Sequence, residues 1–561
     1  MIGPLGLYLA VAFFFFALPL LTSHGSSYAG TGRDPEVFIW ALAWFPHAIL
    51  HGENPFVTHA VWAPSGVNLT WATAVPGLAL IFSPLTLAVG AAASYNVASV
   101  LMPALTAWTA YLLCRYLTRQ LWPSLVGGYL FGFSSYMLGQ EIGHLHVSSV
   151  FLLPLVALVV LRYVRGELDD VQLIVRLGPL LALQLLFTTE IAFTLTLALA
   201  CSIALGILAA PTLRRRLVRL LAPLAASYVL AAVLTAPFLY YLLAGFQGSG
   251  VHPQQIYVTD LVNFAVPTKL SLAGLGWAHS IAHHFPGNDS ERGAYLGVPT
   301  LLIIGLFAWQ RRRTASGRFL VGALLIAVLA TLGAELTVDG KTSLPLPWGR
   351  GILPLPWEHL GYLPLFNNVL VERLSLYVAL AAALMVALWT AARGRGVLRL
   401  LLPALAILAI VPDPGAGVWA TTYTVPPLFT SRAYRSCLGP HENILPLPVN
   451  NNGYSNLWQV ASDFRFTMAG GYIVEHPPAP FVIEHPIAVI ALGFQVPARQ
   501  ARFLRTYIRE KHITSVVVDE AQTRYWAAAL NRIATPHDVG GVRLYHVGEA
   551  GTVRRSPCPR G

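Results

Sequence analysis

Apolar runs long enough to cross a membrane constrain the fold of this chain more than any other feature. A hydrocarbon core of about 30 Å needs about 20 mainly apolar residues in a helix. Only 11% of the 561 residues are charged, whereas soluble domains carry about 25%. Eleven runs approach the required length, at residues 4–22, 96–114, 122–139, 148–165, 171–188, 191–210, 218–245, 295–310, 318–336, 373–392 and 397–412. We therefore predict an α-helical polytopic membrane protein with about eleven transmembrane helices.

The arginines indicate the orientation of these helices. They gather in the loop after every second run, within CRYLTRQ, RYVRGELDD, RRRLVR, QRRRTASGR and AARGRGVLR. Loops on the cytoplasmic side of a membrane collect basic residues, so these five loops are predicted to be cytoplasmic. The N-terminus is then on the cytoplasmic side of the cytoplasmic membrane, and the C-terminus is on its outer side. Arginines in the predicted cytoplasmic loops account for most of the formal charge of +11. We therefore expect no nucleic-acid partner.

One apolar segment, residues 74–92, does not fit this alternation. As a full crossing it would invert the sign of every later loop. The Ser83-Pro84 break and the internal glycines favour a re-entrant or interfacial helix instead. The first outer loop is then expected to hold two helices that lie along the membrane. The predicted outer loops are 23–94, 246–294 and 337–372.

The composition changes after Pro412. Apolar runs shorten to strand length at 442–449, 514–519 and 541–547, with a helical stretch at 521–533 between the last two. About 150 residues can hold a core of their own. We predict a membrane domain over residues 1–412 and a soluble, extracytoplasmic α/β domain over residues 413–561.

The four cysteines divide between these two parts. Cys437 and Cys558 fall in the C-terminal part, where an oxidising compartment would allow a disulfide, and the sequence leaves their pairing open. Cys114 and Cys201 fall in or at the end of apolar runs, where a lone cysteine is usually a small buried hydrophobe.

Two carboxylates begin an aromatic-rich segment of the first outer loop, GRDPEVFIWALAWFPHAILHG (32–52). As a helix start, Asp34 is expected to be the N-cap, Pro35 the first helical residue and Glu36 an acid of the first turn. Acids beside a bilayer also carry a desolvation cost, which makes them functional candidates. Both interpretations apply to Asp34 and Glu36.

The order of features along the chain resembles the GT-C class of integral membrane glycosyltransferases. A first span precedes an outer loop that begins with Asp34-Pro35-Glu36, and many spans and an outer C-terminal domain follow. Five stretches resemble bacterial multi-pass proteins assigned to that class by similarity: GQEIGHLHVSSVFLLPL (139–155), DLVNFAVP (260–267), ERGAYLGVPTLLIIGL (291–306), LPLFNNVLVERLSLYVALA (363–381) and FTMAGGYI (466–473). The sequence shows no obvious second DxD or ExD pair in a later outer loop. The resemblance therefore leaves a divalent cation, Mg²⁺ or Mn²⁺, open.

The resemblance implies an enzyme that moves a hexosyl or pentosyl group from a polyprenyl-phosphate donor, usually with inversion. The acceptor would be a glycan, lipid or protein at the outer face of the cytoplasmic membrane. Such a reaction needs a carboxylate to orient or deprotonate the attacking hydroxyl and cations to stabilise the departing phosphate. Asp34 is the catalytic candidate, and Glu36 is its supporting or metal-binding neighbour.

Glu141, His144 and His146 follow the third span at its outer end and are candidates for binding the substrate. In an extended turn both histidines can point toward one ligand. They would bind phosphate, hold a metal or cap the helix, and the sequence does not choose among these roles. Glu36, His144 and His146 are accordingly the candidate metal ligands.

Arg373 enters the tenth span from outside, against the rule that arginines stay inside. A guanidinium there can hold a lipid-linked phosphate, pair with Glu372 or extend to a headgroup. Lys269 is a second basic candidate for substrate binding. Glu190 is either a second acid of the site or a solvated turn residue, and the second is favoured. The histidines of HSIAHH, which are His279, His283 and His284, have the look of a metal cluster but are expected to be exposed loop residues.

A transporter or flippase of lipid-linked sugars is the competing interpretation, and a polymerase or ligase of surface polysaccharide is a third. A transporter is expected to bury ionisable groups near the middle of its spans. Here the polar candidates fall at the predicted outer ends of spans. That position favours an enzymatic site at one face of the membrane.

Overall fold

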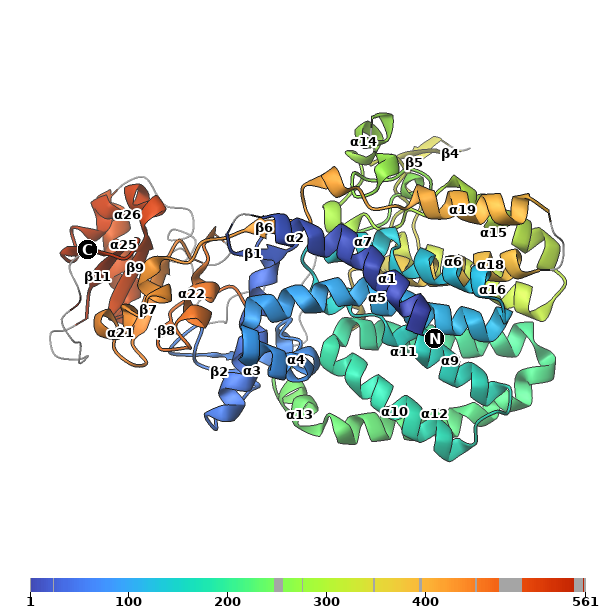
Figure 1. Ribbon diagram of the computed structural model, residues 1–561, viewed down its shortest axis with the longest axis horizontal. Helices are drawn as coiled ribbons and strands as arrows, with labels where there is room; N and C mark the ends of the chain where they lie inside the picture. Colours follow the sequence, from blue (N-terminus) through green and yellow to red (C-terminus); the bar gives the residue numbers. More distant parts are fainter. Residues whose placement is uncertain are drawn as a thin grey trace.

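The computed structural model has two parts that lie at opposite ends of its long axis (Figure 1). A bundle of long helices contains the N-terminal part of the chain, and a small sheet flanked by helices contains the C-terminal part. The structure describes residues 2–23, 25–246, 256–274, 276–346, 349–392, 396–449, 452–473, 497–548 and 558.

Within these described ranges, seven helical segments are long and apolar enough to cross a membrane. They are Ile2–Thr22 (α1, Ile2–Ala12, a π-helical turn, and α2, Leu18–Thr22), α5 (Ala91–Thr118), Leu145–Val164 (α8, Leu145–Ser148, and α9, Leu152–Val164), α10 (Asp170–Phe187), α11 (Thr189–Ala209), Pro211–Leu234 (α12, Arg214–Leu234) and Val371–Ala391 (α18, Ser375–Ala391). The shorter apolar helices are α4 (Pro76–Val89), α15 (Val298–Arg311), α16 (Ala315–Thr331) and α19 (Leu398–Ala409). By length and composition the structure thus supports seven crossings, and a count of eleven stays a prediction.

Two of the predicted runs are broken. The run at 122–139 divides into α6 (Leu121–Gly132) and α7 (Ser135–Glu141), because the Ser134 side chain caps α7 by accepting a hydrogen bond from the Met137 N–H. The run at 218–245 breaks at Thr235, between α12 and α13 (Ala236–Ala244). A proline in the first turn of α13 lacks the backbone N–H that would continue the helical hydrogen bonds of α12.

The arginine-rich loops meet at one end of the bundle. Hydrogen bonds connect them directly: Tyr116 with Glu167, Arg216 with the Val164 carbonyl, Arg318 with the Ala209 carbonyl, and Gln120 with the Ala391 carbonyl. Arg393 and Arg395 of the fifth loop lie outside the described residues. The loops that the sequence assigns to one side of the membrane therefore share one end of the molecule.

α3 (Asp34–Leu50) begins at the carboxylate that we expected to precede it. Its N-cap is Arg33, and no side chain caps it, so the prediction that Asp34 is the cap was wrong. Pro35 stands in the first turn and has no N–H, which removes one of the donors that a cap would satisfy. The Asp34 carboxylate is therefore available for contacts outside the helix.

The apolar side chains of α3 pack against protein. Phe38, Trp40 and Phe45 are fully buried, within a cluster that includes residues of α4, α5 and α22 (Ser455–Ala461). A helix that is apolar on all sides is expected in the interior of a large protein. The aromatic residues that suggested a helix along the membrane surface instead build the core beneath the C-terminal sheet.

The C-terminal residues form a five-stranded mixed sheet of order β10-β11-β9-β7-β8. β7 (Asn443–Leu447) is parallel to β8 (Thr467–Met468) and β9 (Ser515–Asp519), and β11 (Val542–His546) is antiparallel to β9 and β10 (Pro536–Val539). Around it are α20 (Pro427–Thr430), α21 (Tyr434–Cys437), α22, α25 (Pro497–Glu510) and α26 (Thr523–Leu530). A disulfide joins Cys437 to Cys558, the pairing that the sequence left open.

This sheet shares its core with the first outer loop. β1 (Ser27–Ala29) pairs antiparallel with β6 (Ala420–Thr422). The Trp40 indole N–H donates to the Gln459 side-chain oxygen at 2.7 Å, and one hydrophobic core runs from α3 into the strands. The remaining short elements are β2 (Val57–Thr58), β3 (Val67–Asn68), α14 (Trp277–Ala282), β4 (Leu344–Leu346), β5 (Gly349–Gly351) and α17 (Trp357–Leu360).

We predict that the arginine-loop end faces the cytoplasm, because basic loops stay on that side. In a Cys201→Ser background, an Arg312→Cys variant should react with a membrane-impermeant maleimide only after the membrane is opened. An Asp463→Cys variant should react in intact cells. Both positions are exposed in the structure, so the reverse labelling pattern would contradict the orientation.

Candidate functional site

A cluster of charged side chains lies at the end of the bundle opposite the arginine loops. Asp34 begins α3, His144 follows α7, and Glu190 lies in the first turn of α11. Glu291 precedes α15, and Arg373 precedes α18. The structure therefore brings together residues from five separate parts of the chain at helix ends.

Two glycines allow the loop before α3 to approach the loop after α7. At Gly30, which has φ +89°, a Cβ atom would lie 2.6 Å from the Ile142 carbonyl group. At Gly143, with φ +148°, it would lie 3.2 Å from the Pro35 ring. The Thr31 N–H also donates to the Ile142 carbonyl at 2.7 Å. This close backbone contact sets the distance between Asp34 and His144.

Both carboxylate oxygens of Asp34 accept hydrogen bonds. His144 Nε2 lies 3.0 Å from Oδ2, and the Tyr472 hydroxyl donates to Oδ1 at 2.5 Å. Asn456 of α22 holds the Tyr472 backbone, because its amide nitrogen donates to the Tyr472 carbonyl at 2.6 Å. The C-terminal part thus contributes a side chain directly to the acid of the first outer loop.

The other ring nitrogen of His144 also faces an acceptor. Nδ1 lies 2.9 Å from Gln140 Oε1, and the Gln140 amide nitrogen donates to the Ser290 carbonyl at 2.9 Å. This second bond fixes which amide atom faces the ring. Acceptor oxygens therefore stand on both sides of the His144 ring.

Arg373 is held by two carboxylates. Its Nη2 and Nε contact Glu291 at 2.6 and 3.0 Å, and its Nη1 contacts Glu190 at 2.6 Å. All three guanidinium nitrogens therefore have a carboxylate partner. Arg373 therefore pairs with Glu291 and Glu190. The ion pair with the neighbouring Glu372, which the sequence offered as an alternative, is not among its ion pairs in the described chain.

Glu190 was expected to be a solvated turn residue, and that expectation was wrong. Its side chain is only 15% exposed, and Arg373 pairs with it. The reason is long-range packing: the start of α11 meets the start of α18 only in the folded chain.

The sequence contains a second acidic pair that our reading of the motifs missed. Asp289 and Glu291 form a DxE pair in the outer loop 246–294, where no obvious pair had been recognised. The Asn288 side chain accepts hydrogen bonds from the backbone N–H groups of Ser290 and Glu291 at 3.1 Å, which sets the turn. The spacing of the two acids was the available signal.

The surroundings of Asp34 favour its ionised form. Burial by itself raises the pKa of the Asp34 carboxyl group. Hydrogen bonds from His144 and Tyr472 and the charge of Arg373 lower this pKa, and together they outweigh the effect of burial. The net effect places the pKa of Asp34 below its usual range. Asp34 therefore carries a negative charge at neutral pH and can accept a proton.

Glu36 does not join this cluster. It is buried, and its carboxylate contacts Arg33 at 3.1 Å, while the Arg33 guanidinium lies 3.4 Å from the centre of the Tyr454 ring. Burial raises the pKa of Glu36 to about 8, against the opposing effect of Arg33. Glu36 thus holds the start of α3 against the C-terminal part.

Glu141 and His146 are buried behind the cluster. Burial raises the pKa of Glu141 well above its ordinary value. The His146 ring stacks on Phe38 with 5.3 Å between ring centres. Within the described chain, Glu141 Oε1 and His146 Nδ1 have no hydrogen-bond partner. Neither side chain lies in the chain of ion pairs formed by Asp34, His144, Glu291 and Arg373.

Lys269 lies beside the acidic turn. Its ammonium group contacts the Asp289 carboxylate at 2.7 Å, and about a third of each side chain is exposed. The expectation of exposed loop histidines is confirmed for His279, His283 and His284, and His284 contacts Asp339 at 2.9 Å.

The candidate metal ligands do not converge. Glu36 contacts Arg33, His146 stacks on Phe38, and His144 lies between Gln140 and Asp34. Among the described residues, no group of three or more histidine, cysteine, aspartate or glutamate side chains has a spacing suited to a metal. Glu36, His144 and His146 therefore do not form one cation site in the described part of the chain.

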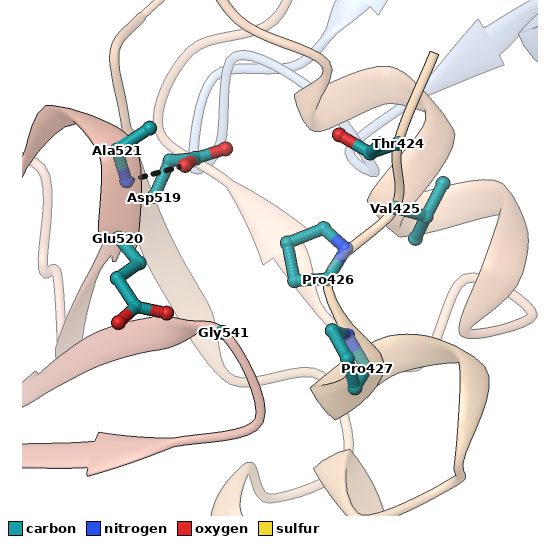
Figure 2. A pocket seen from close by; sticks show the side chains of 8 residues that line it. All are labelled: Thr424, Val425, Pro426, Pro427, Asp519, Glu520, Ala521 and Gly541. Carbon is teal, nitrogen blue, oxygen red and sulfur yellow. Dashed lines mark hydrogen bonds between the residues drawn. The ribbon is translucent and has the colours of Figure 1, made fainter.

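A separate cavity of about 410 Å³ lies in the C-terminal part (Figure 2). It is bounded by the segment Thr424 to Pro427 on one side and by Asp519 and Glu520, at the end of β9, on the other. The Asp519 carboxylate accepts a hydrogen bond from the Ala521 N–H at 3.0 Å. None of the charged residues around Asp34 lines this cavity.

Comparison with known families places most of the chain in one group. Residues 5–411 match the family described as "Domain of unknown function (DUF6311)". The chain belongs to this family. No curated protein matches the sequence.

Solved structures show what the fold of this DUF6311 member resembles. The arabinofuranosyltransferase AftD from Mycobacteria has a TM-score of 0.59 and 15% identity, over 97% of this chain and 40% of AftD. The oligosaccharyltransferase AglB from Archaeoglobus fulgidus has a TM-score of 0.51 and 11% identity, over 98% of this chain and 74% of AglB. The chain therefore spans less than half the length of AftD. Its fold is similar to that of these two transferases.

We predict that Glu36 makes folding stability depend on pH. A folded-state pKa of about 8, above the ordinary 4.5, gives stability that is present below about pH 4.5 and lost as the pH rises through 8. Glu36→Gln should therefore unfold at a higher temperature than wild type at pH 9 and show no such gain at pH 5. The shift sets a ceiling of about 5 kcal/mol for this difference.

The matched control is Glu53→Gln, on the exposed turn after the same helix. Thermal unfolding of the purified chain at both pH values is the measurement. An equal change in both variants, or a Glu36→Gln effect independent of pH, would contradict the assignment.

Proposed function

We propose that the chain is a membrane glycosyltransferase that transfers a hexosyl or pentosyl group from a polyprenyl-phosphate donor. The acceptor is a hydroxyl group of a glycan, lipid or protein at the outer face of the cytoplasmic membrane, and the transfer inverts the anomeric centre. The observation that carries the proposal is the ionised Asp34 carboxylate, held between His144 and Tyr472 at 3.0 and 2.5 Å. It lies at the end of the bundle opposite the arginine loops.

The fold supports this class of reaction. AftD is an arabinofuranosyltransferase and AglB an oligosaccharyltransferase, and AglB was solved with a dolichol-phosphate, a lipid of the proposed donor type. Seven long apolar segments give the chain access to a donor dissolved in the bilayer.

In the proposed step, Asp34 accepts the proton of the acceptor hydroxyl while that oxygen attacks the anomeric carbon. The bond from this carbon to the phosphate oxygen breaks, and its electron pair leaves with the lipid phosphate. The Tyr472 hydroxyl lies as close to Oδ1 as an acceptor hydroxyl would. The acceptor therefore replaces Tyr472 at Oδ1, while His144 keeps Oδ2 in place.

The departing phosphate needs positive charge nearby. Lys269 is the candidate for this role, because an ammonium group has three donors and, among the described residues, Lys269 pairs with one carboxylate, that of Asp289. Arg373 has carboxylates on all its nitrogens. We assign it to positioning: it holds Glu291, whose carboxylate lies 3.9 Å from His144 Nδ1.

The transporter alternative is less well supported. The ionised groups of the cluster lie at the ends of α3, α11 and α18, whereas a transporter is expected to carry them near the middle of its spans. A polymerase or ligase would use the same donor chemistry and differs only in its acceptor.

We predict that Asp34→Asn abolishes transfer while the chain still folds. Loss of a general base typically lowers the rate by about 100- to 10,000-fold. The assay is restoration of the glycan or lipid product that a deletion strain lacks, measured by mass spectrometry, with protein levels checked in the membrane. Asp463→Asn, whose side chain is 78% exposed, is the control and should restore the product. Full restoration by Asp34→Asn would remove Asp34 from the reaction.

We predict that Tyr472→Phe shifts the acidic limb of the pH–rate profile upward. The Tyr472 hydrogen bond lowers the pKa of Asp34, so its removal raises that pKa and protonates the base at a higher pH. Activity should fall below wild type in acid and approach it at neutral pH or above. Tyr525→Phe, at an exposed position of α26, should leave the profile unchanged. A uniform loss at every pH would show that Tyr472 acts only through folding.

A further inference from the structure

A groove lined by arginines lies in the C-terminal part, away from Asp34. Its volume is about 330 Å³. It lies between α25 and Arg532, which follows the end of α26. Arg502, Arg505, Arg509 and Arg532 line it together with Thr506. Among the residues that the structure describes, no carboxylate lines the groove. The described side chains therefore give its walls only positive charge.

Three of these arginines, Arg502, Arg505 and Arg509, share one face of α25. Ala501, Leu504 and Ile508 of the same helix are buried, while Arg502, Arg505 and Arg509 are exposed. Like charges three or four residues apart on a helix repel one another and destabilise it. A helix that needed only to cover the sheet would not require this stripe, so the stripe points to a ligand of opposite charge.

The acids of the neighbourhood do not neutralise the stripe. Within the described chain, none of the four arginines forms an ion pair with a carboxylate. The Arg505 guanidinium donates to the Arg532 backbone carbonyl, which ties the two walls of the groove together. The groove is thus held in shape by the protein while its charge is left uncompensated.

We propose that this groove binds an anionic glycan through successive phosphate or carboxylate groups. The planar guanidinium group of arginine can bind a phosphate or a carboxylate through two parallel hydrogen bonds. At a rise of 1.5 Å per residue, the stripe from Arg502 to Arg509 covers about 10 Å, which is longer than a single phosphate. The groove therefore suits a chain with repeated charges better than one small anion.

The position of the groove argues against a lipid headgroup of the same membrane as its ligand. α25 and α26 lie in the part of the molecule that projects away from the helical bundle (Figure 1). A bilayer around the bundle would be separated from α25 by the first outer loop and the sheet. The proposal concerns binding alone and does not depend on the transferase reaction.

The test measures binding to the full chain in nanodiscs of neutral phosphatidylcholine. The probes are fluorescent oligogalacturonate, inorganic tripolyphosphate and neutral dextran. The variant is Arg502→Gln/Arg505→Gln/Arg509→Gln, and the control Arg432→Gln/Arg435→Gln/Arg524→Gln removes the same charge from exposed positions of the same part. Wild type should bind both anionic probes and not dextran.

The groove variant should raise the Kd for oligogalacturonate at least about tenfold, since it removes three guanidinium groups that donate charge-assisted hydrogen bonds. The control should change it less than about twofold. The variant Arg502→Lys/Arg505→Lys/Arg509→Lys keeps the charge but loses the planar guanidinium groups, and it should weaken binding by an intermediate amount. It also keeps the test valid if the glutamine variant fails to fold.

Three results would overturn the proposal. Wild type could fail to bind either anionic probe, or the groove and control variants could weaken binding equally, which would indicate net charge alone. Nanodiscs that contain anionic phosphatidylglycerol could instead bind through the groove and exclude oligogalacturonate, which would make the membrane its partner.

Discussion

The buried pairing of Arg373 with Glu291 and Glu190 is the interaction on which the rest of the charged cluster depends. The side chains of Arg373 and Glu291 are 10% and 2% exposed. Removal of one partner from a buried ion pair leaves an uncompensated charge, at a typical cost of about 3–5 kcal/mol. Because one guanidinium binds acids from the start of α11 and from the turn before α15, it joins three segments. Contacts then run without a break from Glu190 through Arg373, Glu291 and His144 to Asp34. The hydrogen bond from His144 and the charge of Arg373 both lower the pKa of Asp34.

Features that depend on one segment could be predicted from the sequence. Every predicted apolar run lies on a helix, and the arginine-rich loops gather at one end, because burial in a bilayer and the charge rule act on each run separately. Its position after the first span and beside an aromatic helix also made Asp34 a candidate, and the structure places it next to His144 and Tyr472. The number of crossings was harder to predict, because Ser134 and the proline after Thr235 break two runs.

Features that depend on contacts between distant segments could not be predicted. Tyr472 reaches Asp34 across more than 400 residues, and the stretch that contains it carried only a resemblance and no chemical expectation. Glu190 looked like a solvated turn residue because its partner Arg373 is in another helix. Glu36 and Asp34 are two residues apart on one turn, yet Glu36 turns toward Arg33 and Tyr454. Spacing alone did not separate their roles.

The C-terminal part is therefore better understood as one wall of the site than as an attached domain. α3 packs under its sheet, Trp40 is bonded to Gln459, and Asn456 of the same helix fixes the backbone of Tyr472. The two hydrogen-bond partners of Asp34 therefore come from different parts of the chain: Tyr472 is held by α22, whereas His144 is anchored in the bundle through Gln140. Access to Oδ1 depends on the contacts that hold Tyr472 in the C-terminal part.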